Sequence, residues 1–392
     1  MRKIPFLILI LFSHFACADN GLAPEITDLN AKDISFELEK KLAYLKSPFI
    51  NSSPRDKGDG LLVGSLENGN NNKNSILLYA QELAETSNTI KNGRTDSLLI
   101  AHKGKLIFES YFRRGRANFP HYQMSITKSY TTMALGRAMQ LGYLNMEDLN
   151  KPVISFLKRL DPSKLVKGAS SITLHEAMQM RSGIRLPEKR ISQLIKKPER
   201  LIGQGQIQAY LQFSSAIPSF PRDYKYQASD PSITMQVLEA IVPGTAQDFI
   251  RDKLLKPMQI TNYHWQDDIS GLPKSAAGSR FLSRGMGKMG LLVLKNGKWG
   301  GKQHIPSSFI KQATSPLVQA NNENNYGYFW WSQNREIEGT KYYVIQGRGA
   351  GGQFIFIFPS IELVVVGTAH NKGMGTMLKE LPERLVPAFT EG

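Results

Sequence analysis

The sequence predicts a mixed α/β fold of the α+β type, in which helices flank one antiparallel sheet and an all-helical subdomain is inserted. Short apolar runs bounded by turn residues occur near both ends of the chain, at 97–101, 105–112, 342–346, 353–359 and 362–368. The sequence between them has mostly helical periodicity. We therefore expect strands from both ends of the chain to pair in a single sheet.

The chain has 392 residues, enough for one large domain or two ordinary ones. Residues 1–18 read as a secretory signal, with a basic start, an apolar stretch at 5–12 and an A-x-A cleavage site at 16–18. We expect the mature protein to begin at Asp19 and to be periplasmic or secreted. Lipid attachment to Cys17 is the alternative, but the residues before it match a lipidation signal poorly.

The predicted elements follow in chain order. Residues 19–58 look irregular, and 59–392 look like one folded domain whose helical subdomain covers about 131–275. A hairpin at 102–104 joins the first two strands. Helices are expected at 75–85, 146–158, 173–180, 206–212, 233–240, 246–255 and 378–389, and 291–294 is an apolar run in a region of mixed pattern.

The formal net charge is +16, but the Lys and Arg residues are scattered apart from a cluster at 189–200. No nucleic-acid-binding motif and no transmembrane stretch is present, so we expect no nucleic-acid partner and no membrane-spanning segment. The basic charge fits a solvated surface or attraction to an anionic cell-envelope polymer. Cys17 is the only cysteine, so the mature chain has no disulfide and no Cys-ligated metal.

The most informative motif is Ser125-Ile126-Thr127-Lys128, an S-x-x-K sequence at the start of a predicted helix. Residues three apart on a helix share one face, so the amine can reach the hydroxyl. A neutral Lys128 could act as the base that Ser125 needs to become a nucleophile. Burial lowers a lysine pKa enough for that role.

Two other S-x-x-K sequences begin at Ser155 and Ser308. Ser155 lies inside an apolar run, and Ser308 follows Pro306 as a helix cap. Only Ser125 combines a polar, aromatic loop before it with a helix of small and apolar residues after it. The context therefore favours Ser125 as the nucleophile.

Tyr226 lies in a polar loop ahead of a predicted helix. A tyrosine beside two amines could ionise and act as a base. Packing or a surface hydrogen bond is the ordinary alternative, and Tyr224 is the rival residue.

A glycine-rich segment at 347–353 precedes a strand, and glycine lets the backbone approach a ligand closely. One N–H from this segment could complete an oxyanion hole with that of Ser125. Neither this segment nor 285–290 is a strand-to-helix turn, so their G-x-G-x-x-G patterns do not indicate a dinucleotide site. We expect no cofactor and no metal, because no metal-binding motif occurs and the histidines are dispersed.

Together these motifs resemble the serine β-lactamase and penicillin-binding-protein superfamily over roughly residues 60–390. Among its members, the class C-related serine hydrolases, which include esterases and 6-aminohexanoate-dimer hydrolases, are the most similar. The motifs are Ser125-x-x-Lys128, the segment 172–184, Tyr226 followed by a helix ending in Leu238-Glu239, the Y-G-Y-x-W-W sequence at 326–331, and G-x-G-G-Q at 349–353 followed by Pro359.

The resemblance implies a β-lactamase/transpeptidase-like fold and an acyl-enzyme mechanism. It assigns Ser125 as nucleophile, Lys128 and Tyr226 as the proton relay, and the N–H of Ala350 as the second oxyanion donor. Substrate would bind beside the segment at 347–353 and beside residue 228, two positions after Tyr226. The further residues implied there are Arg348, Gly349, Gly351, Gly352, Gln353 and Ala228.

Two departures bear on the substrate. Ala228 stands where β-lactamases have Asn, and 347–349 stands where they have K-T-G or H-T-G, with Arg348 as the only substitute cation. We expect an exported hydrolase that cleaves an amide or ester of a small molecule or short peptide, with weak β-lactam hydrolysis. The alternatives are a D-Ala-D-Ala carboxypeptidase or penicillin-binding protein, a β-lactamase, and a catalytically decayed binding module.

Overall fold

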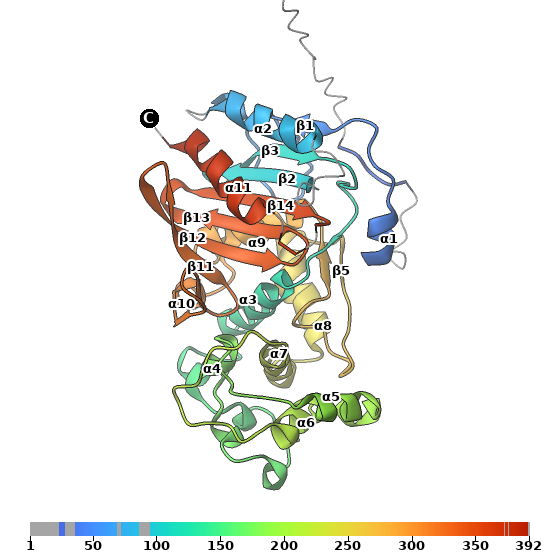
Figure 1. Cartoon of the computed structure of the whole chain (residues 1–392), viewed down its shortest axis with the longest axis vertical. Helices are drawn as coiled ribbons and strands as arrows, with labels where there is room; N and C mark the ends of the chain where they lie inside the picture. Colours follow the sequence, from blue (N-terminus) through green and yellow to red (C-terminus); the bar gives the residue numbers. More distant parts are fainter. Residues whose placement is uncertain are drawn as a thin grey trace, which may run out of the picture.

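A computed structural model describes residues 23–27, 36–68, 72–85, 95–371, 373–374 and 376–390. The predicted signal peptide, with Cys17 and Asp19, lies outside the described residues. Figure 1 shows a sheet with helices on both faces in the upper part of the molecule and a region of helices and loops below it.

The main sheet has nine strands in the order β1-β3-β2-β14-β13-β12-β11-β10-β9, and each neighbouring pair is antiparallel. The pairing of β2 with β14, in which Ile100 lies opposite Val365, joins the two ends of the chain. The prediction of one antiparallel sheet built from both ends is confirmed. The strands are β1 (Phe49–Asn51), β2 (Thr95–His102), β3 (Lys105–Tyr111), β9 (Val318–Gln319), β10 (Asn325–Tyr326), β11 (Trp331–Ile337), β12 (Thr340–Gly349), β13 (Gln353–Phe358) and β14 (Leu363–Ala369).

Strand side chains alternate between two apolar layers, as expected for a sheet buried on both faces. On β13, Phe354 and Phe356 pack with α2 (Lys73–Glu85) and α11 (Met377–Leu385), which cover one face. Ile355 and Ile357 lie in the other layer, with α9 (Ser283–Leu294) and α3 (Ile126–Gln140).

Helix α9 was not foreseen beyond its apolar end at 291–294, because three glycines interrupt it. The fold explains one of them. A Cβ at Gly290 would lie only 2.6 Å from a methyl carbon of Val364 on β14. Glycine therefore lets this helix pack closely on the sheet, which accounts for the second G-x-G-x-x-G pattern without a nucleotide.

The region below the sheet (Figure 1) is mostly helical. The predicted helix at 146–158 is wrong, because only 3-10 turns at Glu147–Asn150 and Val153–Ser155 form on either side of Pro152. The subdomain boundaries themselves stay a prediction. The helices here are α4 (Leu174–Met178), α5 (Glu188–Ile195), α6 (Gly205–Phe213), α7 (Ser229–Ile241) and α8 (Ala246–Phe249), which continues as a π-helical turn at Ile250–Leu255.

The remaining elements are short. Within 19–58, predicted to be irregular, α1 (Phe36–Lys41) and β1 form. Three strands make a second sheet in the order β4-β6-β5, and two make a hairpin. Their bounds are β4 (His121–Tyr122), β5 (Tyr263–Trp265), β6 (Ser279–Phe281), β7 (Lys298–Trp299) and β8 (Lys302–Gln303), and α10 covers Ser307–Thr314.

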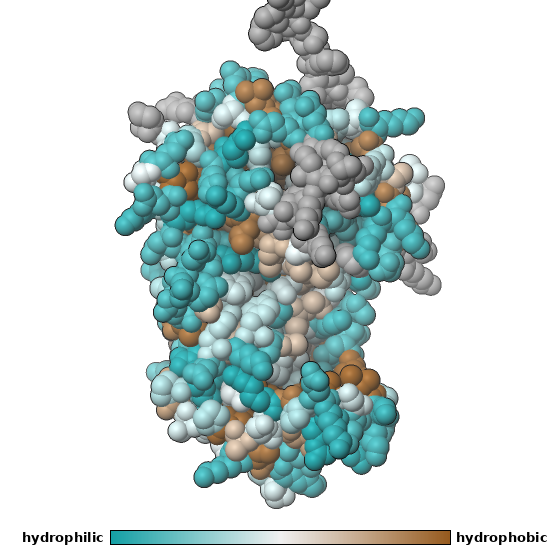
Figure 2. Space-filling model, viewed as in Figure 1, coloured by the Kyte–Doolittle hydropathy of each residue, from teal (hydrophilic) through white to brown (hydrophobic). Residues whose placement is uncertain are grey.

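The face seen in Figure 2 is largely hydrophilic, with apolar atoms gathered over parts of the lower, helical region. That region includes the exposed side chains of Ile191, Ile195 and Ile202, close in sequence to the basic cluster at 189–200. In the part of the chain that the structure describes, no helix is long and apolar enough to cross a membrane.

Candidate active site

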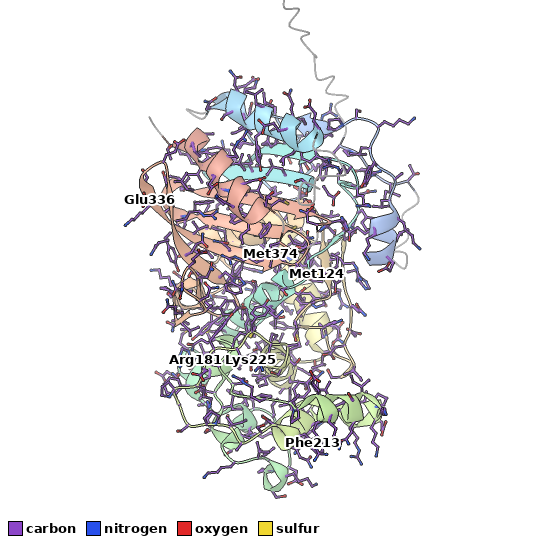
Figure 3. The ribbon with its side chains drawn as sticks, viewed as in Figure 1. Met124, Arg181, Phe213, Lys225, Glu336 and Met374 are labelled. Carbon is purple, nitrogen blue, oxygen red and sulfur yellow. The ribbon has the colours of Figure 1, made fainter. Side chains whose placement is uncertain are left out.

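Ser125 is the residue immediately before the first turn of α3. The residue before it, Met124, has a φ of 49°, in the left-handed region that costs energy for a side chain other than glycine. The hydroxyl of Thr127 donates a hydrogen bond of 2.7 Å to the Met124 carbonyl and holds this turn. Figure 3 labels Met124 where the sheet-bearing part meets α3. Backbone strain next to a residue that opens a buried helix is typical of a functional site.

Lys128 lies one turn further along α3 and is only 4% exposed. Its Nζ donates hydrogen bonds of 3.0 Å to Ser125 Oγ and 2.7 Å to the carbonyl oxygen of Ala276. No carboxylate is paired with it among the described residues. Burial without a counter-charge disfavours the ammonium form and lowers the pKa of Lys128 to about 7. The amine is therefore half neutral at neutral pH and lies in direct contact with the hydroxyl.

The ring of Tyr226 lies against this pair, with Lys128 Nζ 4.7 Å from its centroid. The phenol hydrogen-bonds with the side chain of Ser125. Although 39% of Tyr226 is exposed, burial raises its pKa above the ordinary value, and the Ser125 hydrogen bond and the Arg348 charge offset this only in part. Burial thus favours the neutral phenol, whereas the sequence argument allowed for an ionised one.

Tyr224, the rival, is placed differently. Its hydroxyl is buried without a hydrogen-bond partner among the described residues. Its ring packs on Tyr326, with centroids 5.5 Å apart, and burial raises its pKa well above the usual value. The structure brings Tyr226, and not Tyr224, to Ser125.

The other two S-x-x-K sequences do not form such a pair. No hydrogen bond joins Ser155 to Lys158 or Ser308 to Lys311 in the described structure, and Ser155 Oγ is buried without a partner. The sequence argument that separated Ser125 from them agrees with this geometry.

The end of β12 runs beside the Ser125 turn. A Cβ on Gly347 would touch the Ile126 side chain at 3.4 Å, and one on Gly349 would lie 2.4 Å from the Gln123 carbonyl oxygen. Glycine at 349 is therefore required for this approach. The backbone N–H groups of Ser125 and Ala350 donate to no other described residue. Two N–H groups without a protein acceptor are what an oxyanion needs, and Gly349, the neighbour of Ala350, lies against the turn before Ser125.

The rest of the glycine-rich turn has a structural role. Gly351 and Gly352 have φ values of 90° and 95°, and the Gly351 N–H already donates to the Gly373 carbonyl. The Gln353 side chain, expected near substrate, instead bonds inside the protein. Its Nε2 donates 2.6 Å to the Ala369 carbonyl, and its Oε1 hydrogen-bonds with His121 Nε2.

Arg348 is 7% exposed and its guanidinium is held by side-chain amides. Nε donates to Gln346 at 2.7 Å, and Nη2 donates to Asn324 at 2.6 Å and to Gln333 at 3.1 Å. The group lies 4.9 Å from the centroid of the Trp331 ring. Burial lowers the pKa of Arg348 to about 10, so it stays charged at neutral pH.

Ala228 precedes the first turn of α7 and has no polar side chain to offer a substrate. Its neighbour Gln227 donates to Asp230 Oδ2 at 3.0 Å and to Ser182 Oγ at 3.3 Å. These contacts tie the Tyr226 loop to the segment 172–184. Figure 3 shows the neighbouring Lys225 and Arg181 in the region below α3.

Asp230 was missed by the sequence argument. It is fully buried, and burial raises its pKa to about 7 although Ser182 and Gln227 hydrogen-bond to it. Aspartate is common in the first turn of a helix, where it is usually exposed. The sequence around Asp230 therefore gives no sign that this carboxyl group is buried. Its place under the Tyr226 loop emerges only from the tertiary structure.

The chain matches the family model described as Beta-lactamase over residues 83–385. Among solved structures, a protein of Bacillus anthracis provisionally named a 6-aminohexanoate-dimer hydrolase has a TM-score of 0.64 and 17% identity, covering 92% of this chain and 97% of that one. A class C beta-lactamase has a TM-score of 0.63 and 12% identity, covering 82% and 97%. No curated protein matches the chain in sequence. At these identities the solved structures show a common fold.

A third solved structure is EstCE1, a hydrolase with promiscuous acyltransferase activity. Its TM-score is 0.59 and its identity 15%, with 81% of this chain and 98% of that chain covered. All three neighbours are nearly fully covered, so the likeness extends over the whole of the fold that carries Ser125.

Proposed function

The chain belongs to the beta-lactamase family, and from this premise we propose that it is a serine hydrolase that cleaves an amide or ester bond through an acyl-enzyme on Ser125. The observation that carries the proposal is the 3.0 Å hydrogen bond between Ser125 Oγ and Lys128 Nζ. In the part of the chain that the structure describes, no carboxylate pairs with this amine, and its pKa is lowered to about 7. A buried neutral amine in contact with a hydroxyl is an activated nucleophile pair.

The reaction begins with transfer of the Ser125 proton to Lys128 Nζ as Oγ attacks the carbonyl carbon of the substrate. The N–H groups of Ser125 and Ala350 stabilise the negative charge on the carbonyl oxygen. The leaving amine or alcohol takes a proton from the Lys128–Tyr226 pair when the tetrahedral intermediate collapses. Because burial keeps the Tyr226 phenol protonated, Tyr226 can give its proton to the leaving group and regain one from Lys128.

Water then attacks the acyl-enzyme carbonyl, with Lys128 again as base, and releases the acid. None of these steps needs a metal or a cofactor.

We infer the substrate class from the groups that residues 228 and 348 can offer a substrate. Ala228 offers no amide to a β-lactam, and the guanidinium of Arg348 is already bound to Gln346, Asn324 and Gln333. A carboxylate on the substrate therefore meets no uncommitted cation at residues 347–349. This supports esters and simple linear amides as better substrates than β-lactams.

We also propose that the protein is exported, on the basis of the signal sequence at 1–18. The intact mass of the protein recovered from outside the cytoplasm tests this. A chain starting at Asp19 supports the proposal, and a mass with diacylated Cys17 replaces it by a lipoprotein.

The catalytic proposal is tested with a fluorophosphonate probe and with p-nitrophenyl butyrate. Ser125→Ala should abolish labelling and turnover while the circular dichroism spectrum is unchanged. Ser155→Ala and Ser308→Ala are matched controls from the other two S-x-x-K sequences and should keep near wild-type activity. Labelling that survives Ser125→Ala would refute the assignment. An unlabelled wild-type protein would favour a binding module.

A further inference from the structure

Three side chains from distant parts of the sequence meet in a buried cluster that the reaction does not use. They are Glu39 of α1, His121 of β4 and His370, which directly follows β14. One ligand-type atom from each lies within 4.8 Å of the other two. We propose that Glu39, His121 and His370 bind one Zn²⁺ ion, which fastens the N-terminal segment to the catalytic fold.

The atoms that converge are of the right kind. Glu39 Oε1 is in contact with His121 Nδ1 and lies 3.6 Å from His370 Nε2. Zinc in proteins takes imidazole nitrogen and carboxylate oxygen at about 2.0–2.1 Å in tetrahedral geometry, which puts neighbouring ligand atoms about 3.3 Å apart. Small side-chain movements suffice to bring this trio to those distances, and water can complete the four ligands.

The second ring nitrogen of each histidine provides an independent argument. His370 Nδ1 lies 2.5 Å from Asp96 Oδ2, and His121 Nε2 hydrogen-bonds with Gln353 Oε1. In zinc sites the ligating histidine usually donates its other N–H to a carboxylate or carbonyl, which fixes the ring and its tautomer. Here both histidines have such an acceptor on the side away from Glu39.

With those two acceptors engaged, the remaining lone pairs of His121 Nδ1 and His370 Nε2 face Glu39. Zn²⁺ would take the place of the proton between His121 and Glu39, which leaves for solvent. The two neutral imidazoles and one carboxylate would give the site a charge of +1, and Asp96 beside His370 would neutralise it. The donor set favours Zn²⁺ over Mg²⁺ or Ca²⁺, which prefer oxygen ligands.

The position of the site indicates its role. The three side chains are buried, so the ion would be structural and out of reach of substrate. It would close chain segments of 82 and 249 residues, taken as 121 minus 39 and 370 minus 121. The ion would also stabilise the turn that carries Ala350. His121 hydrogen-bonds with Gln353, which ends this turn, and Gln353 Nε2 donates to the carbonyl of Ala369 at the end of β14.

The test uses the mature chain after dialysis against a chelator, with Zn²⁺ alone as the probe in isothermal titration calorimetry. We expect about one Zn²⁺ per chain, and a Tm rise of about 4 °C when free Zn²⁺ is a hundred times its Kd. Co²⁺ in place of Zn²⁺ should give the intense visible absorption of a four-coordinate site.

Matched variants locate the site. Glu39→Gln and His370→Ala should abolish the binding, and Asp96→Asn should weaken it about 10-fold or more. His264→Ala removes a partly exposed histidine on β5 and should leave binding unchanged. The proposal is overturned if wild-type protein does not bind Zn²⁺, or if Glu39→Gln and His370→Ala bind it as well as wild type. The wild-type titration and Co²⁺ spectrum decide the matter if a variant fails to fold.

Discussion

The pKa of Lys128 should set the pH dependence of acylation at Ser125. Lys128 is buried, its recorded hydrogen bonds go only to neutral acceptors, and its pKa falls from the ordinary 10.5 to about 7. At pH 7 about half of the amine is then neutral, against about one part in 3,000 for an unperturbed lysine. Burial therefore gives the site on the order of 10³ times more base at neutral pH.

The assay is the second-order rate of fluorophosphonate labelling, which reports acylation without deacylation, measured from about pH 5 to pH 10. Because only the neutral amine can accept the Ser125 proton, the rate should rise tenfold per pH unit and level off above about pH 7. Lys128→Arg, which keeps the positive charge but cannot lose a proton at these pH values, should lower the rate by roughly 10²–10⁴-fold at every pH.

A chemical variant moves the pKa without removing the amine. In a Cys17→Ser background, Lys128→Cys can be alkylated with bromoethylamine to give a lysine analogue with sulfur in the chain. Sulfur withdraws electrons, so its amine has a lower pKa, and the midpoint should move to lower pH. A midpoint near pH 10, or one that ignores this replacement, would refute the reasoning.

Three further outcomes are expected. Tyr226→Phe should cut turnover by roughly 10²–10⁴-fold, while Tyr224→Phe should be mild because its hydroxyl has no hydrogen-bond partner among the described residues; the reverse order of activities would exclude Tyr226 from the relay. Ala228→Asn should raise nitrocefin turnover about 10-fold relative to that of a p-nitrophenyl ester, since it restores an amide donor; rapid nitrocefin hydrolysis by the wild type would contradict this. Asp230→Asn should stabilise the protein by up to about 4 kcal/mol at pH 8 and much less at pH 4. The pKa of Asp230 is about 7 in the folded protein against an ordinary 3.8, so the carboxyl group lowers the free energy of unfolding as the pH rises from about 4 to 7. Urea unfolding at both pH values measures this, and equal effects of the substitution at the two pH values would disprove it.

The sheet could be predicted from the sequence because its strands are continuous apolar runs that end at turns. The run at 353–359 became β13, and its alternate side chains fill two different cores. The prediction of a long helix at 146–158 was wrong because it followed the apolar periodicity and gave too little weight to Pro152. Proline has no backbone N–H to donate inside a helix, and only short 3-10 turns form on either side of it. Helix α9 was missed for the opposite reason. Its glycines lower the helix propensity of the segment, but they allow the helix to pack closely against the sheet.

The candidate site was predictable to the extent that it is local. Ser125 and Lys128 are one helical turn apart, so their contact follows from the spacing alone. The proximity of Tyr226, a hundred residues later, rested on the resemblance to a family, and the structure places its hydroxyl at Ser125. Its protonation state depends on burial, which no spacing encodes.

The cluster of Glu39, His121 and His370 shows the same limit more clearly. Each residue is isolated in sequence, and none stands in a metal-binding motif, so the histidines looked dispersed. They come together through pairings between distant parts of the chain: β4, which carries His121, pairs with β6, and β14, which His370 follows, pairs with β2. Long-range contacts of this kind are a property of the sheet order, which the sequence predicts only in outline.

Arg348 shows how the chemistry beside the site changes where two of the three residues of a motif differ, since Gly347-Arg348-Gly349 stands in place of K-T-G or H-T-G. A lysine or histidine in a K-T-G or H-T-G motif ends in a compact group, whereas Arg348 ends in a planar fork that its neighbours can hold from several sides. Gln346, Asn324 and Gln333 supply those acceptors from β12, the turn before β10, and β11. The charge is thereby held close to Tyr226, where it offsets part of the rise in pKa that burial causes. On the proposed function, a cation held in this way would act on the reaction through its field and would not bind a substrate carboxylate.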